Sequence, residues 1–389
     1  QRNVELMWLT GRLMPDFKTI ANFRKDNGPA IRSTCRQFVV LCQRLGFFSE
    51  ALVAIDGSKF KAVNNRDRNF TQAKLQRRMA EIEASISRYL TDLDTADRQA
   101  PAAAQAKKER LQDKIAALKA QMKELKEIEV KLEATPDKQI SLTDPDARSM
   151  KTRGTGVVGY NVQTAVDAKH HLIVAHEVTN VGLDIDQLSG MAKQARAAMG
   201  TQDLTAIADR GYFKSEEILA CHEAGITAIV PKTTWSGAKA DGRFDRADFI
   251  YDTQKNEYRC PAGQALIWRY ASLQRGLMQH RYWSSNCQQC AIKEKCTPSV
   301  QRRVTRWEHE AVLETMEARL DQAPQSMRIR RQTVEHPFGT LKLWMGNAHF
   351  LTKTLDRVST EMGLHVLAYN LKRVMKILGN DALMKAMRA

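Results

Sequence analysis

The sequence predicts an α/β fold in which a mixed sheet of about five strands is flanked by helices. Short apolar runs at 51–57 and 204–211 have the length and composition of buried strands. Alternating apolar and polar residues at 159–180 are typical of a β-hairpin. The stretches between and after these segments have apolar residues at helical spacing, which favours a sheet covered by helices.

The size and composition are those of a globular protein. The chain has 389 residues, enough for two or three domains, with 43% hydrophobic and 27% charged residues. No apolar run approaches the roughly 20 residues of a membrane span, and the N-terminus lacks the apolar region of a signal peptide. Because the chain begins with Gln1, we expect that an upstream segment is missing.

The charge balance and the cysteines indicate a polyanion partner and a reducing compartment. The net charge is +16, from 60 basic and 44 acidic residues, which favours DNA or RNA as the partner over a membrane. The alternative is a basic soluble protein without such a partner. Seven cysteines without a secretory signal indicate free or metal-bound thiols rather than disulfides.

Residues 1–50 are predicted to be helical. Phe17, Ile20 and Phe23 recur at helical spacing before an Asn-Gly stop. A second amphipathic helix carries Cys35 and Cys42 seven residues apart on its apolar face. Free cysteine is among the most buried residue types, so we expect these two thiols to lie in the core rather than to bind metal.

Two insertions are expected to divide the sheet and its helices. We assign 51–70 and 136–232 to the first parts of the core and 326–389 to its C-terminal helical part. Two heptad-like apolar series within 71–135 predict an antiparallel helical hairpin. The irregular, aromatic and Cys-rich segment 233–325 is the second insertion.

Two carboxylates are expected to converge at strand ends. The strand "ALVAIDGS" is predicted to end at Asp56, and the strand "LTAIADRG" at Asp209. Groups at strand termini of an open α/β sheet meet in a crevice, although Asp-Gly is also a common turn. Glu335 is a candidate third acidic residue, because two divalent cations need several carboxylate oxygens.

The stretch "RIRRQTVEHPFGTLKLW" places charged residues on one helical face. At about 100° per residue, Arg331, Glu335, Phe338 and Lys342 fall within roughly 60° of each other. The cations can hold DNA phosphates while the carboxylate holds metal; the alternative is an exposed Arg-Glu pair. His336 lies about 100° from Glu335, so the two are not expected to act as an acid–base couple.

Four cysteines have spacing that suits a metal. "YRCPAG" supplies Cys260, and "NCQQCAIKEKC" supplies Cys287, Cys290 and Cys296. A C-x2-C-x5-C segment with a distal fourth cysteine can form a tetrahedral zinc site. Reduced structural thiols and an iron–sulfur cluster are the alternatives, because the paired C-x2-C signature is absent.

Eight motifs together resemble a DDE transposase of the insertion-sequence type. The chain is similar to the IS1182 family within the broad IS4/IS5-like group, over almost its whole length. The motifs occur in the order AIDGSKFKA, TDPDARSMK, VGYNVQTAVD, ADRGYF, YRCPAG, CQQCAIKEKC, VEHPFGTLK and LAYNLKRV. The resemblance implies a ribonuclease-H-like core with Asp56, Asp209 and Glu335 as the acidic triad.

The resemblance also implies cofactors, partners and a mechanism. Two Mg²⁺ or Mn²⁺ ions held by the triad would support DNA strand cleavage and strand transfer. The expected partners are the terminal inverted repeats and target DNA, bound by a homodimer in a synaptic complex. Residues 1–50 would be a truncated DNA-binding domain, and the protein would act in the bacterial cytoplasm, at the nucleoid.

The signature of the group departs from its usual form at one position. The pattern Tyr-x2-Arg-x3-Glu-x6-Lys is met by Arg331, Glu335 and Lys342, but Arg328 stands at the tyrosine position. By this resemblance Arg328, Arg331 and Lys342 are the expected DNA-binding residues. The family marker Asp144-Pro145-Asp146 is expected to have no catalytic role.

Three other functions are compatible with parts of the sequence. An inactive or domesticated transposase-derived protein would bind DNA without cutting it. A ribonuclease-H-like nuclease would cleave without strand transfer. A zinc-dependent regulator would account for the cysteines but for none of the carboxylates.

Overall fold

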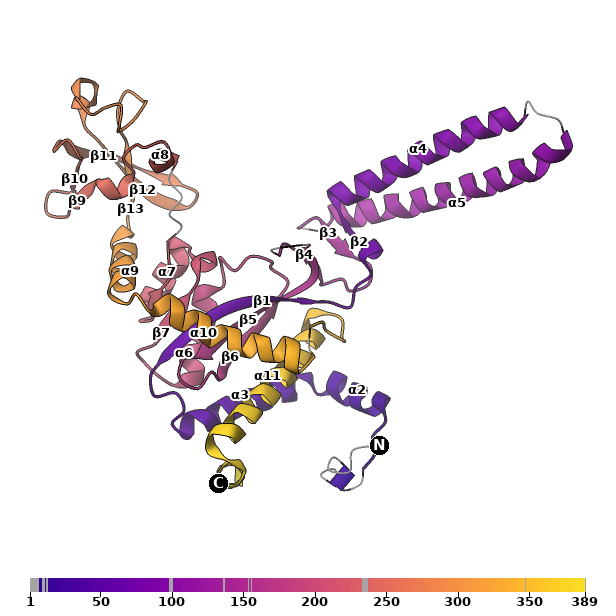
Figure 1. Cartoon of the computed structure of the whole chain (residues 1–389), viewed down its shortest axis with the longest axis horizontal. Coiled ribbons are helices and arrows are strands. Elements are labelled where there is room, and N and C mark those ends of the chain that lie inside the picture. Colours follow the sequence, from indigo (N-terminus) through magenta and orange to yellow (C-terminus); the bar gives the residue numbers. More distant parts are fainter. Residues whose placement is uncertain are drawn as a thin grey trace.

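The protein is mixed α/β and centred on a six-stranded sheet (Figure 1). The computed structural model describes residues 7–8, 11, 13–97, 101–135, 137–152, 154, 156–232, 237–346 and 348–388. The sheet comprises β1 (Leu52–Lys61), β4 (Arg148–Met150), β5 (Val157–Asp167), β6 (Ile173–Thr179), β7 (Thr205–Ala208) and β8 (Thr227–Ile229).

Strand β5 organises the sheet. It pairs antiparallel with β1 on one side and with both β4 and β6 on the other. Strand β7 pairs parallel with β1, and β8 pairs parallel with β7. The predicted hairpin at 159–180 is confirmed as β5 and β6, because alternation of polar and apolar residues suits neighbouring antiparallel strands.

The first strand is longer than predicted. It continues through Asp56 and Gly57 to Lys61, paired with β5 throughout, so the expected end at Asp56 is wrong. Gly57 is in extended pairing rather than in a turn, and a Cβ there would lie 2.4 Å from Nε2 of Gln163. The glycine therefore permits close packing within the sheet, not a chain reversal.

The two faces of β1 pack against different helices. Val53 and Ile55 join a core cluster with α3 (Gly28–Arg44), α6 (Leu188–Met199) and α7 (Ser215–Glu223). Phe60 joins a second cluster with residues of α10 (Ser326–Gly339) and α11 (Leu355–Leu378). Side chains alternate along a strand, so Asp56 shares the face of Phe60 and points toward the α10 side.

The N-terminal helices follow the sequence prediction in part. Cys35 and Cys42 of α3 are buried, and the Cys35 thiol donates to the carbonyl of Gly363 on α11 at 3.2 Å. Helix α2 (Phe17–Asp26) is present as predicted. Its Phe17, Ile20 and Phe23 are nevertheless exposed, so its apolar stripe contributes nothing to the core.

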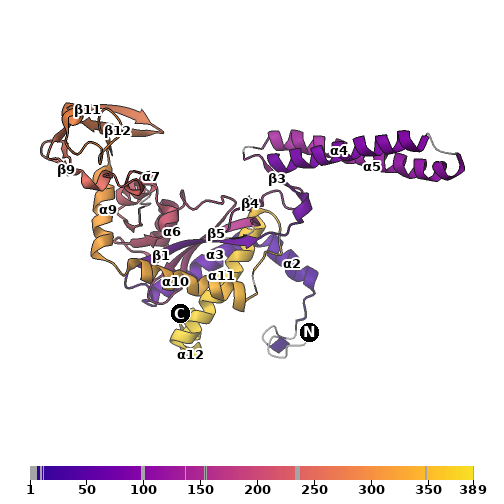
Figure 2. The ribbon, with the colours of Figure 1, turned by 45° about the horizontal axis from the view of Figure 1, so that its top comes forward.

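Two long helices project from the body of the molecule (Figures 1 and 2). Helices α4 (Gln72–Asp97) and α5 (Pro101–Glu133) pack against each other, with the short strands β2 (Asn69–Thr71) and β3 (Gln139–Ser141) paired at their base. The pair has its own apolar cluster, formed by residues such as Leu75 and Leu132.

The Cys-rich segment contains an ordered sheet rather than irregular chain. Its five antiparallel strands are β9 (Ile250–Asp252), β10 (Glu257–Arg259), β11 (Ala265–Gln274), β12 (Leu277–Trp283) and β13 (Val304–Trp307), after the short helix α8 (Gly237–Ala240). The following helix, α9 (Glu310–Gln322), returns to the main core through Leu313 and Met316.

The Asp144-Pro145-Asp146 turn anchors the start of α11. Asp144 is buried and accepts hydrogen bonds from the Tyr160 hydroxyl at 2.9 Å and from the Thr354 backbone N–H at 3.0 Å. Asp146 accepts from the Leu355 N–H at 2.8 Å. These carboxylates satisfy helix N-terminal donors that would otherwise lack partners, which gives the turn a structural role.

The C-terminal part is helical, as predicted. Helix α10 runs through Pro337 and leads into a π-helical segment, Thr340–Trp344, before α11 and the short α12 (Asn380–Arg388). Among the described residues, no helix combines the length and apolar character that crossing a membrane requires.

Candidate active site

Asp56 and Asp209 lie side by side at adjacent parallel strands. Ile55 is opposite Ala208 in the β1–β7 register, so the residues that follow each of them are neighbours. Asp209 immediately follows β7, and its Oδ1 accepts from the Gly211 N–H at 2.8 Å. This bond begins a short 3-10 turn and fixes the carboxylate at the C-terminal end of β7.

Arg330 joins the two carboxylates. Its Nη2 lies 2.5 Å from Oδ1 of Asp56 and 3.2 Å from Oδ2 of Asp209. The side chain is 13% exposed, and its Nε is buried with no hydrogen-bond partner within the described structure. A single nitrogen thus bridges both acids, where a structural arginine clamp commonly uses two.

Arg330 was not among the residues predicted from the sequence, whereas the predicted Arg328 and Arg331 are both exposed. A usable signal existed in the helical periodicity. Four buried side chains lie at −4, +3, +4 and +7 from Arg330, namely Ser326, Thr333, Val334 and Pro337. An arginine on the buried face of a helix needs a charged or polar partner there.

Burial dominates the electrostatics of Asp56. It raises the pKa of the carboxyl to about 6, and the charge of Arg330 opposes this shift. The nearby Asp209 and Asp184 raise the pKa further. The acid pair is therefore only partly compensated by the one guanidinium.

Glu335 stands apart from this pair. It is exposed, and no ion pair links it to another described residue. In the described part of the chain, no group of three or more His, Cys, Asp or Glu side chains is arranged to hold a metal ion. The structure thus brings together two of the three predicted acids.

Lys342 is hydrogen-bonded to strand β1 close to Asp56. Its Nζ donates to Ser58 Oγ at 2.7 Å and to the Lys59 carbonyl at 2.9 Å, and it lies over the Phe60 ring. Burial lowers the pKa of the ammonium group. The prediction that Glu335, Phe338 and Lys342 share one helical face is wrong. Phe338 is buried while Glu335 is exposed, and Lys342 lies in the π-helical segment, where the regular helical spacing is interrupted.

An open depression of about 660 Å³ lies next to this lysine. Lys59, Lys151 and Lys342 line it, together with Ser58 and Asp184. Asp184, which the sequence analysis did not select, forms an ion pair with Lys59 at 3.2 Å. The lining is predominantly basic and is contiguous with the Asp56 strand, which suits an anionic backbone.

His336 has a packing role. Its Nδ1 lies 2.8 Å from the Tyr369 hydroxyl, which in turn donates to the His171 carbonyl at 2.7 Å. Burial lowers the pKa of the His336 imidazole. These contacts attach α10 to α11 and to the β5–β6 turn, in agreement with the prediction that His336 does not form a couple with Glu335.

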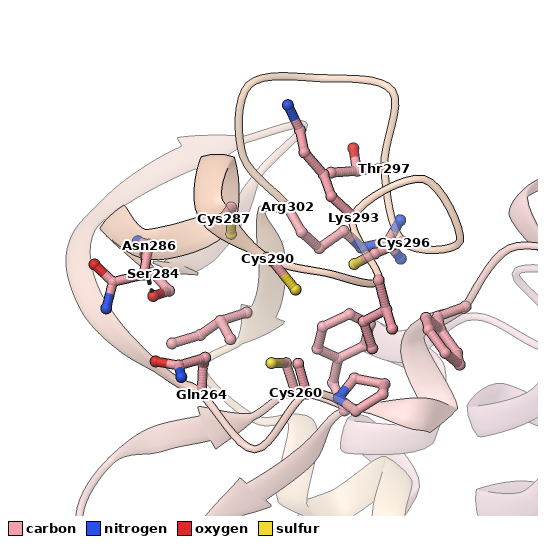
Figure 3. A pocket seen from close by; sticks show the side chains of 16 residues that line it. Cys260, Gln264, Ser284, Asn286, Cys287, Cys290, Lys293, Cys296, Thr297 and Arg302 are labelled. Carbon is pink, nitrogen blue, oxygen red and sulfur yellow. Dashed lines mark hydrogen bonds between the residues drawn. The ribbon is translucent and has the colours of Figure 1, made fainter.

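The four selected cysteines surround one small cavity (Figure 3). Cys260, Cys287, Cys290 and Cys296 all line this space of about 30 Å³. Burial raises the pKa of the Cys296 thiol, and the other three thiols are close enough to raise it further. As placed, the thiols do not form a metal-binding group.

The carboxylate pair has suitable donors for a divalent metal. Hard cations such as Mg²⁺ take carboxylate oxygens as ligands. Asp56 and Asp209 already direct one oxygen each at a shared cationic nitrogen. The two carboxylates therefore have the chemistry to bind such an ion, but Glu335 does not lie with them.

Comparisons with known proteins give one family match and one weak structural similarity. Residues 259–375 match the family described as "Transposase DDE domain". This range contains Glu335 and the four cysteines but neither Asp56 nor Asp209. No curated protein matches the chain.

A solved structure with some similarity is the cryo-EM structure of a piggyBac transposase synaptic complex with hairpin DNA. The identity is 10%, the match covers 59% of this chain and 44% of that chain, and the TM-score is 0.24. The chain therefore spans less than half of that protein's length, and similarity at this level carries no argument here.

Proposed function

We propose that this chain is a DDE transposase that cleaves DNA and transfers strands through divalent metal ions. The observation that carries the proposal is the placement of Asp56, within β1, and Asp209, directly after the adjacent parallel strand β7, around one shared cation. The family match at residues 259–375 and the ordered sequence motifs support it.

The strand arrangement supports a ribonuclease-H-like core for this function. An antiparallel series β1, β5 and β6 is extended on the other side of β1 by the parallel strands β7 and β8. In this arrangement β1 and β7 are neighbours. The carboxylates of Asp56 and Asp209 therefore lie side by side, although about 150 residues separate them in the chain.

In the proposed reaction, Asp56 and Asp209 hold the metal, and Glu335 completes the acidic triad. Bound metal would activate the attacking oxygen and stabilise the leaving oxygen of the phosphodiester. Lys342 and the exposed Arg328 and Arg331 neutralise DNA phosphates and position the backbone. A carboxyl group binds metal in its deprotonated form, and burial, which raises the pKa of Asp56 to about 6, moves the loss of this proton to higher pH than for an ordinary aspartate.

Strand cleavage tests this function. The protein is incubated with terminal-inverted-repeat DNA and Mn²⁺ or Mg²⁺, beside Asp209→Ala and the exposed control Asp203→Ala. We expect cleavage by the wild type and the control and none by Asp209→Ala. Equal cleavage by all three proteins would refute the assignment of the acidic residues.

A DNA-binding protein without catalysis is the second candidate. Two observations favour it. Glu335 is separated from Asp56 and Asp209, and Arg330 forms an ion pair with each of those two aspartates. This candidate predicts salt-sensitive DNA binding but no cleavage at any Mn²⁺ concentration.

We also propose that the four thiols around the small cavity bind a structural zinc ion. Two tight turns support this, since Gly263 N–H donates to the Cys260 carbonyl and Cys290 N–H to the Cys287 carbonyl. Metal analysis should give about one zinc per chain. Cys287→Ser should lose it, whereas Cys42→Ala, at a buried thiol of α3, should retain it; no zinc in the wild type contradicts the proposal.

We propose that the protein acts as a homodimer bound to the two DNA ends of a mobile element, since strand transfer must bring both ends together. The proposed location is the bacterial cytoplasm. Light scattering of the protein with inverted-repeat DNA tests the stoichiometry. Two chains on two DNA ends are expected, and one chain per end without pairing contradicts the proposal.

A further inference from the structure

We infer that Arg330 is a resident counter-ion that competes with divalent metal for Asp56 and Asp209, and so controls occupancy of the acid pair. The inference rests on the proposed function only in taking these carboxylates as metal ligands. It adds a role for a residue outside the acidic triad and outside the signature Arg331.

Arg330 occupies the space between the two carboxylates. The Nη2 atom of Arg330 is within hydrogen-bond distance of Oδ1 of Asp56 and of Oδ2 of Asp209. A metal ion bridging the acids would use oxygens that face the same point. The guanidinium and the metal cannot occupy that point together, so binding of one requires withdrawal of the other.

The guanidinium of Arg330 is incompletely hydrogen-bonded. Both recorded bonds use Nη2, and Nε is buried without a partner among the described residues. A buried donor that has lost its water without gaining an acceptor is destabilising. The arginine is thus incompletely satisfied, unlike a bidentate structural pair, and withdrawal into solvent would relieve this defect.

Helix α10 is held in place by apolar side chains other than Arg330. Val334, Pro337 and Phe338 are buried in α10, and Val334 is fully so. These apolar contacts do not depend on the Arg330 head group. The side chain can therefore leave the acid pair by rotation about its own bonds while α10 stays packed on the sheet.

The test is Mn²⁺ binding by the full chain, followed by the electron paramagnetic resonance signal of free Mn²⁺ at fixed pH and salt. We expect Arg330→Gln to bind Mn²⁺ roughly tenfold more tightly than the wild type, because a competing charge is gone. Arg330→Lys retains a competing charge and should return the affinity toward that of the wild type. Arg388→Gln, which removes an equal charge at an exposed position of α12, should leave it unchanged.

A stability measurement covers the case in which a variant folds poorly. Without metal, Arg330→Gln leaves two carboxylates facing each other, and its melting temperature should fall. Mn²⁺ should restore more of that temperature in Arg330→Gln than it adds to the wild type, because a ligand stabilises the state that binds it. An equal or smaller gain contradicts the inference.

The substitution Asp56→Asn separates this inference from the proposed function. If Mn²⁺ binding is lost in Asp56→Asn but is equal or weaker in Arg330→Gln, the acid pair is a metal site and the counter-ion inference is wrong. If Asp56→Asn leaves the Mn²⁺ affinity unchanged both in the wild type and in Arg330→Gln, both the metal site and the inference are wrong.

Discussion

Asp56 and Asp209 are neighbours because β1 and β7 run parallel with Ile55 opposite Ala208. Asp56 lies in the middle of its strand, whereas Asp209 lies just beyond the end of its own. The relationship is a property of the sheet backbone rather than of flexible loops. Paired strands hold these two carboxylates with little freedom to move apart.

Replacing Asp144 should destabilise the protein strongly. In Asp144→Ala, the buried Tyr160 hydroxyl and the Thr354 N–H lose their acceptor, and we expect a loss of about 3 kcal/mol in the free energy of unfolding. Asp146→Ala removes one helix-terminal acceptor and should cost about 1 kcal/mol. Urea unfolding measures both, and equal losses would contradict the structural role assigned to Asp144.

The stability contribution of Asp167 should fall as pH rises. Burial raises the pKa of this carboxyl to about 6 from an ordinary 3.8, so the folded state binds its proton more tightly than the unfolded state. The contribution is therefore fully present below about pH 4 and lost as the pH passes 6, by about 3 kcal/mol.

The variant Asp167→Asn isolates this effect, since it has no proton to lose. Unfolding free energies of the wild type and Asp167→Asn are measured from pH 4 to pH 8. The wild type should lose stability relative to the variant across this range. A difference that does not change with pH would exclude a raised pKa at Asp167.

Lys342 should contribute one phosphate contact to DNA binding. In Lys342→Ala, the slope of log affinity against log salt should decrease in magnitude by roughly 0.9. Lys385→Ala, at an exposed position of α12, serves as the control and should leave the slope unchanged. Fluorescence anisotropy with labelled inverted-repeat DNA gives both slopes, and identical slopes for Lys342→Ala and the wild type would remove Lys342 from the interface.

The strands were predictable because apolar runs and alternation have direct structural meanings. The end of β1 was not, since Asp-Gly is ambiguous between a turn and a close approach of chains. The choice between a turn and a close approach depends on Gln163 and Asp184, which pack against Gly57. These residues come from β5 and from the loop that follows β6, so local sequence could not supply the answer.

The candidate site was predictable in its acids but not in its cation. Asp56 and Asp209 follow from the strands that carry them, but Glu335 depends on the rotation of α10 relative to the sheet. The buried neighbours of Arg330 indicate the rotation that the structure shows, whereas the charged residues around Arg331 suggested a different one. The π-helical segment then changed the position of Lys342, which a regular helical wheel does not anticipate.

The most direct test of the account is the position of metal in a crystal of the protein with inverted-repeat DNA and Mn²⁺, located by anomalous scattering. The account predicts a Mn²⁺ peak at bonding distance from both Asp56 and Asp209, with Arg330 withdrawn. A complex that cleaves its DNA while Arg330 still bridges the two acids and the Mn²⁺ peak lies elsewhere would contradict it.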